Sequence, residues 1–213
     1  MNPQLESISY AVNNSRHVTI DYSKLEEVCS NIKAEDLIPR IGLSLFDVAN
    51  RDLASRIDFA IIFNSVNFCY WGTPKWTIKT KDGEFDGAFG MVNALRQAID
   101  NGYPLLDSSY LKNICAKDLE SILHGNVPIP LFSERLEMLQ ETGRVLGDRY
   151  NGHFVGWFGR VANDAVRLVD VLTKDIKHYH DGAIYKGKEI FFHKRAQLAI
   201  TQINTVLTAA GQP

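Results

Sequence analysis

The sequence predicts a mainly α-helical protein, with at most a small β-hairpin near Trp76. The strongest evidence is the stretch Phe132 to Tyr150, in which apolar residues recur at intervals of three and four, as on one face of a helix. A second helix is indicated from Gly87 to Asn101, because the following Asn-Gly pair is a typical C-terminal cap. The hairpin signal is the possible strand Trp76-Thr77-Ile78, followed by an Asp-Gly turn.

Two short helices are predicted near the N-terminus. Residues Pro3 to Val12 have helical apolar spacing. Ser23 with Glu26 fits a capping box, in which each side chain accepts a hydrogen bond from the main chain of the other, for a helix that runs through Ile32. Because both helices are short, we expect them to be stable only when packed against other parts of the chain.

The segment Ser44 to Ala60 also has helical spacing and leads into an almost continuous apolar run, Phe59 to Phe63. Such a run belongs in the protein interior. The amides of Asn64 and Asn67 follow at the end of this buried element. Buried amides need hydrogen-bond partners, so these two residues either hold the backbone in place or reach a ligand.

The C-terminal half is expected to be helical as well. Two short helices are predicted between Tyr103 and Pro130, and a last helix from about Lys188. After the helix Phe132 to Tyr150 and an Asn-Gly turn, a second apolar pattern runs from Phe154 to Leu172. Two long helices joined by a two-residue turn predict an antiparallel helical hairpin in the core.

Length and composition are those of an ordinary globular protein, most simply one domain over residues 1–213. The formal net charge of -2 gives no electrostatic reason to expect direct binding to a duplex or a whole tRNA. Cys29, Cys69 and Cys115 have no metal-ligand spacing and are expected to be reduced thiols. We find no signal peptide and no apolar run near the roughly 18 residues that span a bilayer, so we expect a soluble cytoplasmic protein with no membrane partner.

A candidate reaction centre lies around Asp181. This carboxylate precedes a short turn at Gly187 and a segment that carries Lys194 and Arg195. A reactive site can consist of a carboxylate on a loop that faces cations in the first turn of the next helix. Either Lys194 or Arg195 could then pair with a phosphate. The alternative is that Asp181 caps a turn and that the two cations form a solvated helix face.

One kind of chemistry for this centre uses a metal. His178, His180 and His193 cluster near Asp181, and imidazoles with a carboxylate could hold divalent ions in a metal phosphohydrolase. That interpretation also requires histidines at ligand spacing on other helices, which the sequence does not offer, so no metal is expected. Phosphate-binding glycine loops and the Gly-x-Ser-x-Gly elbow are absent too, so the common nucleotide folds have no support.

The other kind of chemistry uses Asp181 without a metal. Cleavage of an N-glycosidic bond passes through an oxocarbenium-like sugar cation, which a fixed carboxylate can stabilise or trap covalently. Tyr179, Phe68 and Trp71 could hold a flat base by stacking, at about 1 to 3 kcal/mol each. The residues by themselves leave these alternatives open.

A set of motifs in fixed order narrows the choice. The motifs are Asn67-Phe68-Cys69-Tyr70-Trp71, Gly87 with Ala94-Leu95, Asn101-Gly102-Tyr103-Pro104, Tyr179-x-Asp181, Tyr185-x-Gly187-Lys188 and Phe192-His193-Lys194-Arg195-Ala196-Gln197. In order and spacing they resemble the queuosine-salvage protein family, from about Leu43 to Ile203. The first and last motifs are unusual combinations, which makes the match specific.

The resemblance implies a queuosine 5′-phosphate N-glycosylase, which hydrolyses queuosine 5′-monophosphate and releases queuine for reuse in tRNA modification. It also implies an all-helical fold akin to the helix-hairpin-helix DNA glycosylases, and no metal or organic cofactor. By motif, Asp181 is the expected catalytic carboxylate, acting on C1′ of the ribose as nucleophile or cation stabiliser, and Lys194 is expected to bind the substrate, at its phosphate. The residues expected to line the base pocket are Asn64, Asn67, Phe68, Trp71 and Tyr179.

The chain departs from the family pattern in two places. Family members usually carry an aspartate where this chain has Asn64, which alters charge recognition of the substrate's aminomethyl side chain. The chain also stops at Pro213, before a helical segment with an Ala-Asp-Tyr motif that family members have, so we expect it to be C-terminally short. One alternative function is therefore a noncatalytic relative that binds a nucleotide or base and lacks part of the site. The other is the metal-dependent phosphohydrolase.

Overall fold

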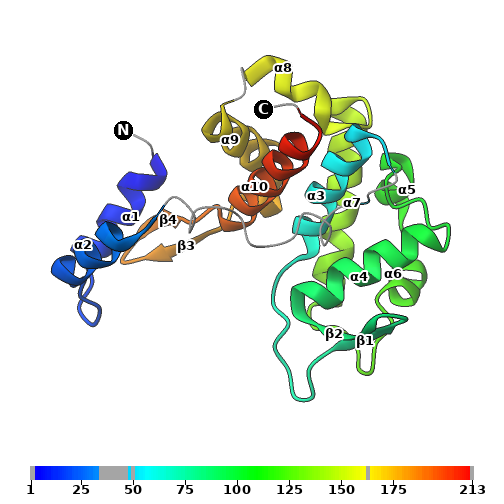
Figure 1. Cartoon of the computed structure of the whole chain (residues 1–213), viewed down its shortest axis with the longest axis horizontal. Coiled ribbons are helices and arrows are strands. Elements are labelled where there is room, and N and C mark those ends of the chain that lie inside the picture. The colour runs from blue at the N-terminus through cyan, green and yellow to red at the C-terminus, as the bar shows by residue number, and fades with distance from the viewer. Residues whose placement is uncertain (1–2, 34–47, 49–50, 162–163, 212–213) are drawn as a thin grey trace. The chain divides into compact units, whose positions relative to one another are not determined.

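The computed structural model describes residues 3–33, 48, 51–161 and 164–211, and these are mainly helical, as the sequence predicts (Figure 1). The helices are α1 (Pro3–Asn13), α2 (Tyr22–Asn31), α3 (Leu53–Val66), α4 (Gly87–Asp100), α5 (Ser108–Asn113), α6 (Ala116–Ile122), α7 (Phe132–Tyr150), α8 (Phe158–Val161), α9 (Ala165–Asp175) and α10 (Lys194–Ala209), with the 3-10 helices η2 (Phe154–Trp157) and η3 (Lys177–Tyr179). The strands form two antiparallel hairpins, β1 (Thr77–Thr80) with β2 (Gly83–Asp86) and β3 (Gly182–Tyr185) with β4 (Lys188–Phe191).

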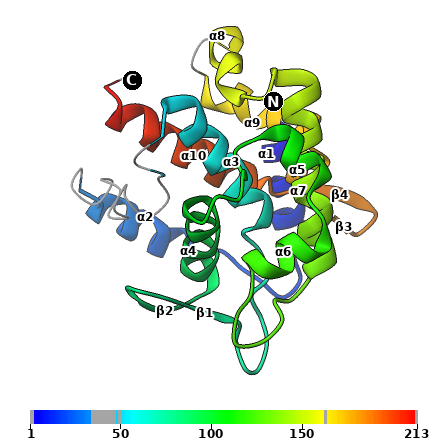
Figure 2. The ribbon, with the colours of Figure 1, turned by 90° about the vertical axis from the view of Figure 1, so that its right-hand side faces the viewer.

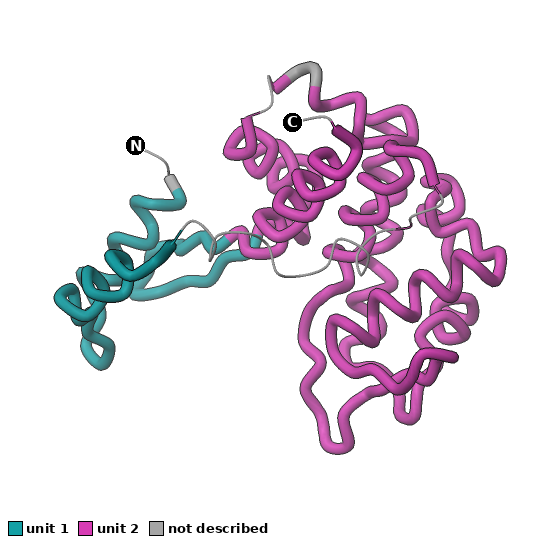
Figure 3. The backbone as a smooth tube through the Cα atoms, in the orientation of Figure 1, with its two compact units in different colours: residues 1–42, 181–192 teal, residues 43–180, 193–213 magenta. Residues whose placement is uncertain are grey.

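The chain divides into two compact units, which Figure 3 shows in different colours. Unit 1 consists of Met1–Gly42 and Asp181–Phe192, and unit 2 of Leu43–His180 and His193–Pro213. A single domain over the whole chain stays a prediction. In the described part of the chain, no helix is both long and apolar enough to cross a membrane.

Helix α3 is the central element of unit 2. Phe59, Ile61 and Phe63 are at most 1% exposed, which confirms the interior position predicted for this run. One side of α3 packs into a core shared with α4, α5, α6 and α7, and the other side packs into a core shared with α9 and α10. Each such side chain stabilises the fold by about 1.5 to 3 kcal/mol through burial. Polar groups on α3 must therefore find partners inside the protein.

The predicted hairpin near Trp76 is confirmed as β1 and β2. Ile78 pairs with Phe85 across the two strands, and both strands lie against α4 (Figure 2). Trp76 itself is buried, and its indole N–H donates to the carbonyl of Leu123 at 3.0 Å. This bond ties the start of the hairpin to the end of α6.

The N-terminal helices are confirmed, but the cap predicted for the second is wrong. Helix α2 is capped by Asp21 rather than Ser23, because the Asp21 carboxylate accepts the N–H of Lys24 at 3.0 Å. The Ser23 hydroxyl donates to the same carboxylate at 2.7 Å. An aspartate two positions earlier, in extended conformation, therefore replaces the expected capping box.

The helix predicted within Ser44 to Ala60 begins at Leu53. Asp52 is its N-cap, and its carboxylate accepts the N–H of Ser55 at 2.9 Å. Residues 44–47 and 49–50 of the predicted segment lie outside the described residues. The helix Gly87 to Asn101 and the two short helices before Pro130 are confirmed as α4, α5 and α6.

The predicted long helix from Phe154 to Leu172 is wrong, and so is the antiparallel pair that it would form with α7. The segment consists instead of η2, α8 and α9, and α9 packs against α10. Two carboxylates fix where parts of this segment begin. Asp58 on α3 accepts the N–H of Phe154 at 2.8 Å and fixes the start of η2. Asp164 accepts the N–H of Val166 at 2.9 Å and so begins a new helix.

The last helix begins at Lys194, not near Lys188 as predicted, because a second hairpin precedes it. Lys186 and Gly187 both have positive φ, at 48° and 78°, as a two-residue hairpin turn requires. Within unit 1, α1 packs against β4, and the N–H of Phe191 donates to the Ser7 hydroxyl at 3.0 Å. The apolar spacing of this segment suits either a strand or a helix start, and pairing between β3 and β4 decides in favour of the strand.

Candidate active site

Asn64 lies in the last turn of α3 and is completely buried. Its side-chain N–H groups donate to the carbonyl of Ala60 at 2.8 Å and to the amide oxygen of Gln202, on α10, at 2.7 Å. Its own amide oxygen has no hydrogen-bond partner among the described residues. A buried acceptor without a partner costs about 1 to 3 kcal/mol. Asn64 thus holds α3 against α10, the structural role that its position at the end of a buried run allows.

The loop Asn67 to Trp71 follows α3 directly. Asn67 is the C-cap of the helix, and its amide oxygen accepts the hydroxyl of Tyr70 at 3.0 Å. Phe68 is half-buried, whereas Trp71 is 79% exposed. The loop therefore presents one large aromatic ring to solvent while its neighbours face the protein.

Tyr179 is fully buried at the end of η3. Its hydroxyl donates to the carbonyl of Ile61 at 2.5 Å and lies 3.3 Å from the hydroxyl of Ser65. The Ser65 hydroxyl in turn lies 2.8 Å from that of Thr142, on α7. These bonds join α3, α7 and η3, and they leave the Tyr179 ring inside the core rather than on a stacking surface.

Glu141, on α7, fixes the segment before Tyr179. Its carboxylate accepts the N–H of Lys177 at 2.9 Å and lies 2.8 Å from Nδ1 of His178. Burial acts to raise the pKa of Glu141, but the hydrogen bonds from His178 and Lys177 outweigh it and lower the pKa to about 2. Glu141 is therefore ionised at neutral pH and tethers this segment to α7.

The start of α10 carries the two predicted cations. Lys194 is the first residue of the helix and is exposed. The guanidinium of Arg195 donates to the main-chain carbonyl of His178 and lies 5.2 Å from the centre of the Phe68 ring. Arg195 therefore connects the loop that carries Phe68 to the segment that carries His178 and Tyr179.

Asp181, the predicted catalytic residue, belongs to unit 1 and is half-buried. Its main-chain carbonyl accepts the N–H of Phe192 at 2.8 Å, which closes the open end of the β3–β4 hairpin. It lies two residues after Tyr179 in the chain. Within unit 2, hydrogen bonds and ring contacts form a network around Phe68 and Tyr179, while Asn64 bonds to Ala60 and Gln202. The catalytic role of Asp181 stays a prediction.

Three residues of this network were missed from the sequence, namely Arg135, Glu141 and Thr142 on α7. Arg135 is fully buried, and its guanidinium donates to main-chain carbonyls of the Phe68 loop. Its burial could have been predicted from its spacing, because Arg135, Leu139 and Thr142 follow one another at intervals of four and three residues and so share one face of α7, which is buried. The apolar residues alone do not predict that a charged side chain shares that buried face.

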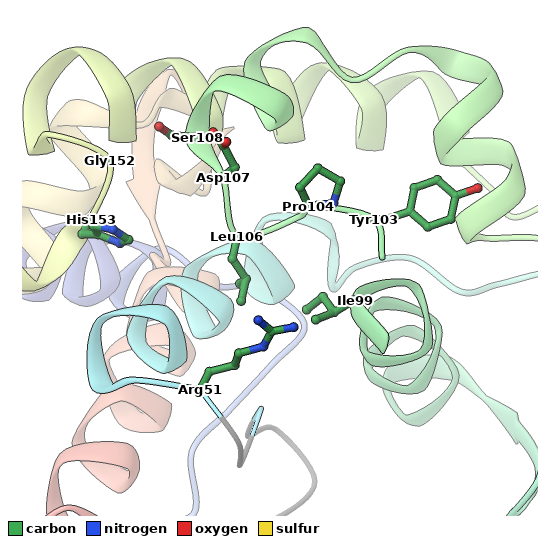
Figure 4. A pocket seen from close by; sticks show the side chains of 9 residues that line it. All are labelled: Arg51, Ile99, Tyr103, Pro104, Leu106, Asp107, Ser108, Gly152 and His153. Atoms are coloured by element: carbon green, nitrogen blue, oxygen red, sulfur yellow. The ribbon is translucent and has the colours of Figure 1, made fainter. Parts of the chain in front are cut away.

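A separate cavity of about 470 Å³ lies at the other end of α3 (Figure 4). Arg51, just before α3, extends toward Leu106 and Ile99, and His153 forms another wall. Nδ1 of His153 lies 2.6 Å from the buried carboxylate of Asp58. Burial raises the pKa of Asp58, although the hydrogen bonds that it accepts from Phe154 and His153 oppose this. None of the predicted site residues lines this cavity.

The three histidines near Asp181 do not assemble a metal centre. Across the described ranges, no group of three or more His, Cys, Asp or Glu side chains is placed to hold a metal ion. His178 is bound to Glu141, and the rings of His180 and His193 lie 5.1 Å apart.

Comparison with known proteins identifies the family. The model of the queuosine salvage protein family matches residues 47–212 of this chain. The chain belongs to the queuosine salvage protein family. The match spans α3 to α10 and therefore includes the loop with Phe68 and Trp71, the segment with Tyr179 and Asp181, and the start of α10.

Three relatives of this chain are each named queuosine 5′-phosphate N-glycosylase/hydrolase. A queuosine 5′-phosphate N-glycosylase/hydrolase of Sphaerobacter thermophilus is 31% identical over 198 residues, which cover 90% of this chain and 59% of the relative. The mouse protein of the same name is 26% identical over 97% of this chain and 63% of its own length. The Schizosaccharomyces pombe protein is 24% identical over 95% of this chain and 64% of its own length. The chain thus spans about three fifths of each of these relatives.

Proposed function

We propose that this chain acts on queuosine 5′-monophosphate, hydrolysing the N-glycosidic bond and releasing queuine for salvage into tRNA. The observation that carries the proposal is the family match over residues 47–212, together with relatives that are named queuosine 5′-phosphate N-glycosylase/hydrolase. The substrate is a small nucleotide, so direct binding to tRNA is not part of the proposal. The fold is proposed to be akin to the helix-hairpin-helix DNA glycosylases.

In this proposal Asp181 acts at C1′ of the ribose, as nucleophile or as stabiliser of the sugar cation. A 7-deazapurine has carbon in place of N7, so the leaving base cannot be activated by protonation there. The chemistry therefore depends on cation stabilisation by a carboxylate and on hydrogen bonds elsewhere on the base. No metal or organic cofactor is required for these steps.

The remaining residues divide by exposure. Trp71 and Lys194 are exposed, so Trp71 is suited to stack on the base and Lys194 to pair with the phosphate. Asn67 and Phe68 line the base pocket from the same loop as Trp71. Asn64 and Tyr179, which are buried, contribute to the pocket by fixing its walls.

A noncatalytic relative that binds the nucleotide or base is the second candidate. The family match and the names of the relatives favour the hydrolase over this alternative. Such a protein would bind queuosine 5′-monophosphate without releasing queuine. Both candidates are proposed to operate in the cytoplasm, in keeping with the free thiols of Cys29, Cys69 and Cys115.

A chromatographic assay for queuine distinguishes the candidates. The purified chain is incubated with queuosine 5′-monophosphate, with and without a chelator, and binding of the nucleotide is measured in parallel by calorimetry. Queuine in both samples supports the metal-free N-glycosidase. Binding without queuine supports the noncatalytic relative. Folded protein that neither binds the nucleotide nor releases queuine overturns both proposals, and phosphate as the product would point to a phosphohydrolase.

A further inference from the structure

Arg135 is a completely buried cation in the middle of unit 2. Its Nε donates to the carbonyl of Pro130 at 3.0 Å, in the segment just before α7. Its terminal nitrogens donate to the carbonyl of Val66, to that of Phe68 at 2.5 Å and to that of Cys69 at 2.9 Å. All of these acceptors are main-chain carbonyls, so the side chain acts on backbone rather than on another charged group.

The acceptors on α3 and its loop are 66 to 69 residues away from Arg135 in the sequence. A guanidinium offers five N–H donors in a rigid plane, and here that plane meets three carbonyls of the segment from Val66 to Cys69. A lysine ammonium at the same place would be a single point donor and could not reach the same set. Burial lowers the pKa of Arg135, but the side chain stays charged at any ordinary pH.

The same guanidinium also contacts the aromatic rings of the loop. Its central carbon lies 4.3 Å from the centre of the Phe68 ring and 5.0 Å from that of Tyr70. Tyr70 in turn donates its hydroxyl to Asn67. Cys69 has a positive φ of 43°, a conformation that is uncommon for a residue with a side chain and that costs about 1 kcal/mol or more. Arg135 therefore holds the loop in a shape that it would not adopt alone.

Trp71 is the loop residue that projects outward. Asn67, Phe68 and Tyr70 are at least half-buried, whereas Trp71 is 79% exposed. An exposed indole at the end of a rigid loop can stack on a flat base without first losing the conformational freedom of the loop. The fixed backbone thus prepares a stacking surface.

We propose that Arg135 is a positioning residue for recognition of the base: it touches no substrate atom, and it fixes the Phe68 to Tyr70 backbone so that Trp71 is held ready to stack. The proposal rests on the proposed function, because it takes the loop as the base-binding surface. It makes Arg135, rather than the residues that meet the base, the source of the loop's rigidity.

The kinetic test compares Arg135→Lys and Arg135→Met with Arg144→Lys and Arg144→Met, since Arg144 is exposed on the same helix. With rates corrected for folded fraction, both Arg135 variants are expected to raise KM for queuosine 5′-monophosphate about tenfold and to leave kcat within about threefold. The lysine variant should not rescue KM. An unchanged KM in folded Arg135→Lys overturns the proposal, because a purely structural role alters only the amount of active protein.

Hydrogen exchange tests the positioning without any turnover. In Arg135→Lys, amide exchange in residues 67–71 is expected to accelerate at least about tenfold, with the amides of α4 and α9 unchanged. Loop exchange equal to that of Arg144→Lys overturns the proposal, as does acceleration throughout unit 2. If the wild-type chain neither binds nor cleaves the nucleotide, the proposed function fails, and so does the role of Arg135 in recognition of this base. Loop exchange that still depends on Arg135 would then show only that Arg135 positions the loop.

Discussion

Nδ1 of His178 lies 2.8 Å from the carboxylate of Glu141, which also accepts the N–H of Lys177 at 2.9 Å. The pair fastens the end of η3 to α7 at a distance of 37 residues in the sequence. On the other side of the same segment, Arg195 donates to the His178 carbonyl. Lys177 and His178, which precede Asp181 in the chain, are thus held by bonds from two helices, α7 and α10.

Glu141→Gln is expected to destabilise the protein by about 2 kcal/mol at pH 7, since hydrogen bonds to a charged group are lost. The folded-state pKa of Glu141, about 2, lies below its ordinary value of 4.5. The stabilisation is therefore present above pH 4.5 and is lost as the pH falls from there toward 2. Urea unfolding of wild type and variant between pH 7 and pH 3 measures this difference.

The matched control is Glu137→Gln, an exposed glutamate one turn earlier on α7. It should change the free energy of unfolding by no more than about 0.5 kcal/mol at any of these pH values. A Glu141→Gln difference that stays constant from pH 7 to pH 3 would show that the charge of Glu141 contributes nothing.

Tyr179→Phe should lower the free energy of unfolding by about 1 kcal/mol. The loss is modest because the Ser65 hydroxyl also donates to the Ile61 carbonyl, at 2.9 Å, and continues to do so in the variant. A double-mutant cycle with Ser65→Ala is expected to give a coupling energy of about 0.5 to 1 kcal/mol. Strict additivity of the two substitutions would mean that the two hydroxyls do not interact.

Gly143→Ala is expected to destabilise the protein by about 3 kcal/mol, because α7 packs directly on α5 at this point. A methyl group on Gly143 would clash with the main-chain nitrogen of Lys112 and would lie 2.6 Å from Cβ of Leu111. Gly147→Ala, one turn later, is the control, since its nearest neighbour is the Ser108 hydroxyl at 3.5 Å. Thermal unfolding should show Gly147→Ala neutral or stabilised by up to about 1 kcal/mol, and equal effects at both sites would refute this packing.

Asp181→Asn is expected to lower kcat roughly a thousandfold or more, because in the proposed function the carboxylate charge stabilises the sugar cation, and the variant removes that charge while keeping the shape. Single-turnover release of queuine from queuosine 5′-monophosphate measures the effect, with Asp170→Asn, an exposed aspartate on α9, as the control. Turnover by folded Asp181→Asn that matches wild type would remove Asp181 from the catalytic role.

Lys194→Ala should raise KM for the phosphorylated substrate about tenfold, with little change in kcat, if its ammonium pairs with the phosphate. The nucleoside queuosine provides the internal comparison, since its KM should be the same for wild type and variant. Lys174→Ala, an exposed lysine at the end of α9, should change neither value. Equal effects on nucleotide and nucleoside would exclude the phosphate as the partner of Lys194.

Much of the secondary structure could be predicted because it depends on near neighbours in the chain. The bounds of α7 and α4 follow from apolar spacing and from caps within a few residues. The errors arose where distant groups intervene, as when the Asp58 carboxylate on α3 accepts the N–H of Phe154 and fixes the start of η2, where a long helix was expected. The second hairpin was missed because a short segment with mixed spacing becomes a strand only when it pairs.

The candidate site shows the same division. The motifs around Phe68, Asp181 and Lys194 point from the sequence alone to a family, and the family match is confirmed. No periodic pattern predicts that Tyr179 would be fully buried or that Trp71 would be exposed. Those properties depend on which helices pack together.

The sequence by itself therefore determined the helical class, most of the helix bounds and the family, because residue order and local spacing carry that information. Only the tertiary structure decided that Arg135 donates hydrogen bonds to main-chain carbonyls 66 to 69 residues away and that Glu141 pairs with His178. The physical reason is that a buried polar side chain needs a hydrogen-bond partner inside the protein. For Arg135 and Glu141 the packed helices supply that partner from a distant part of the chain.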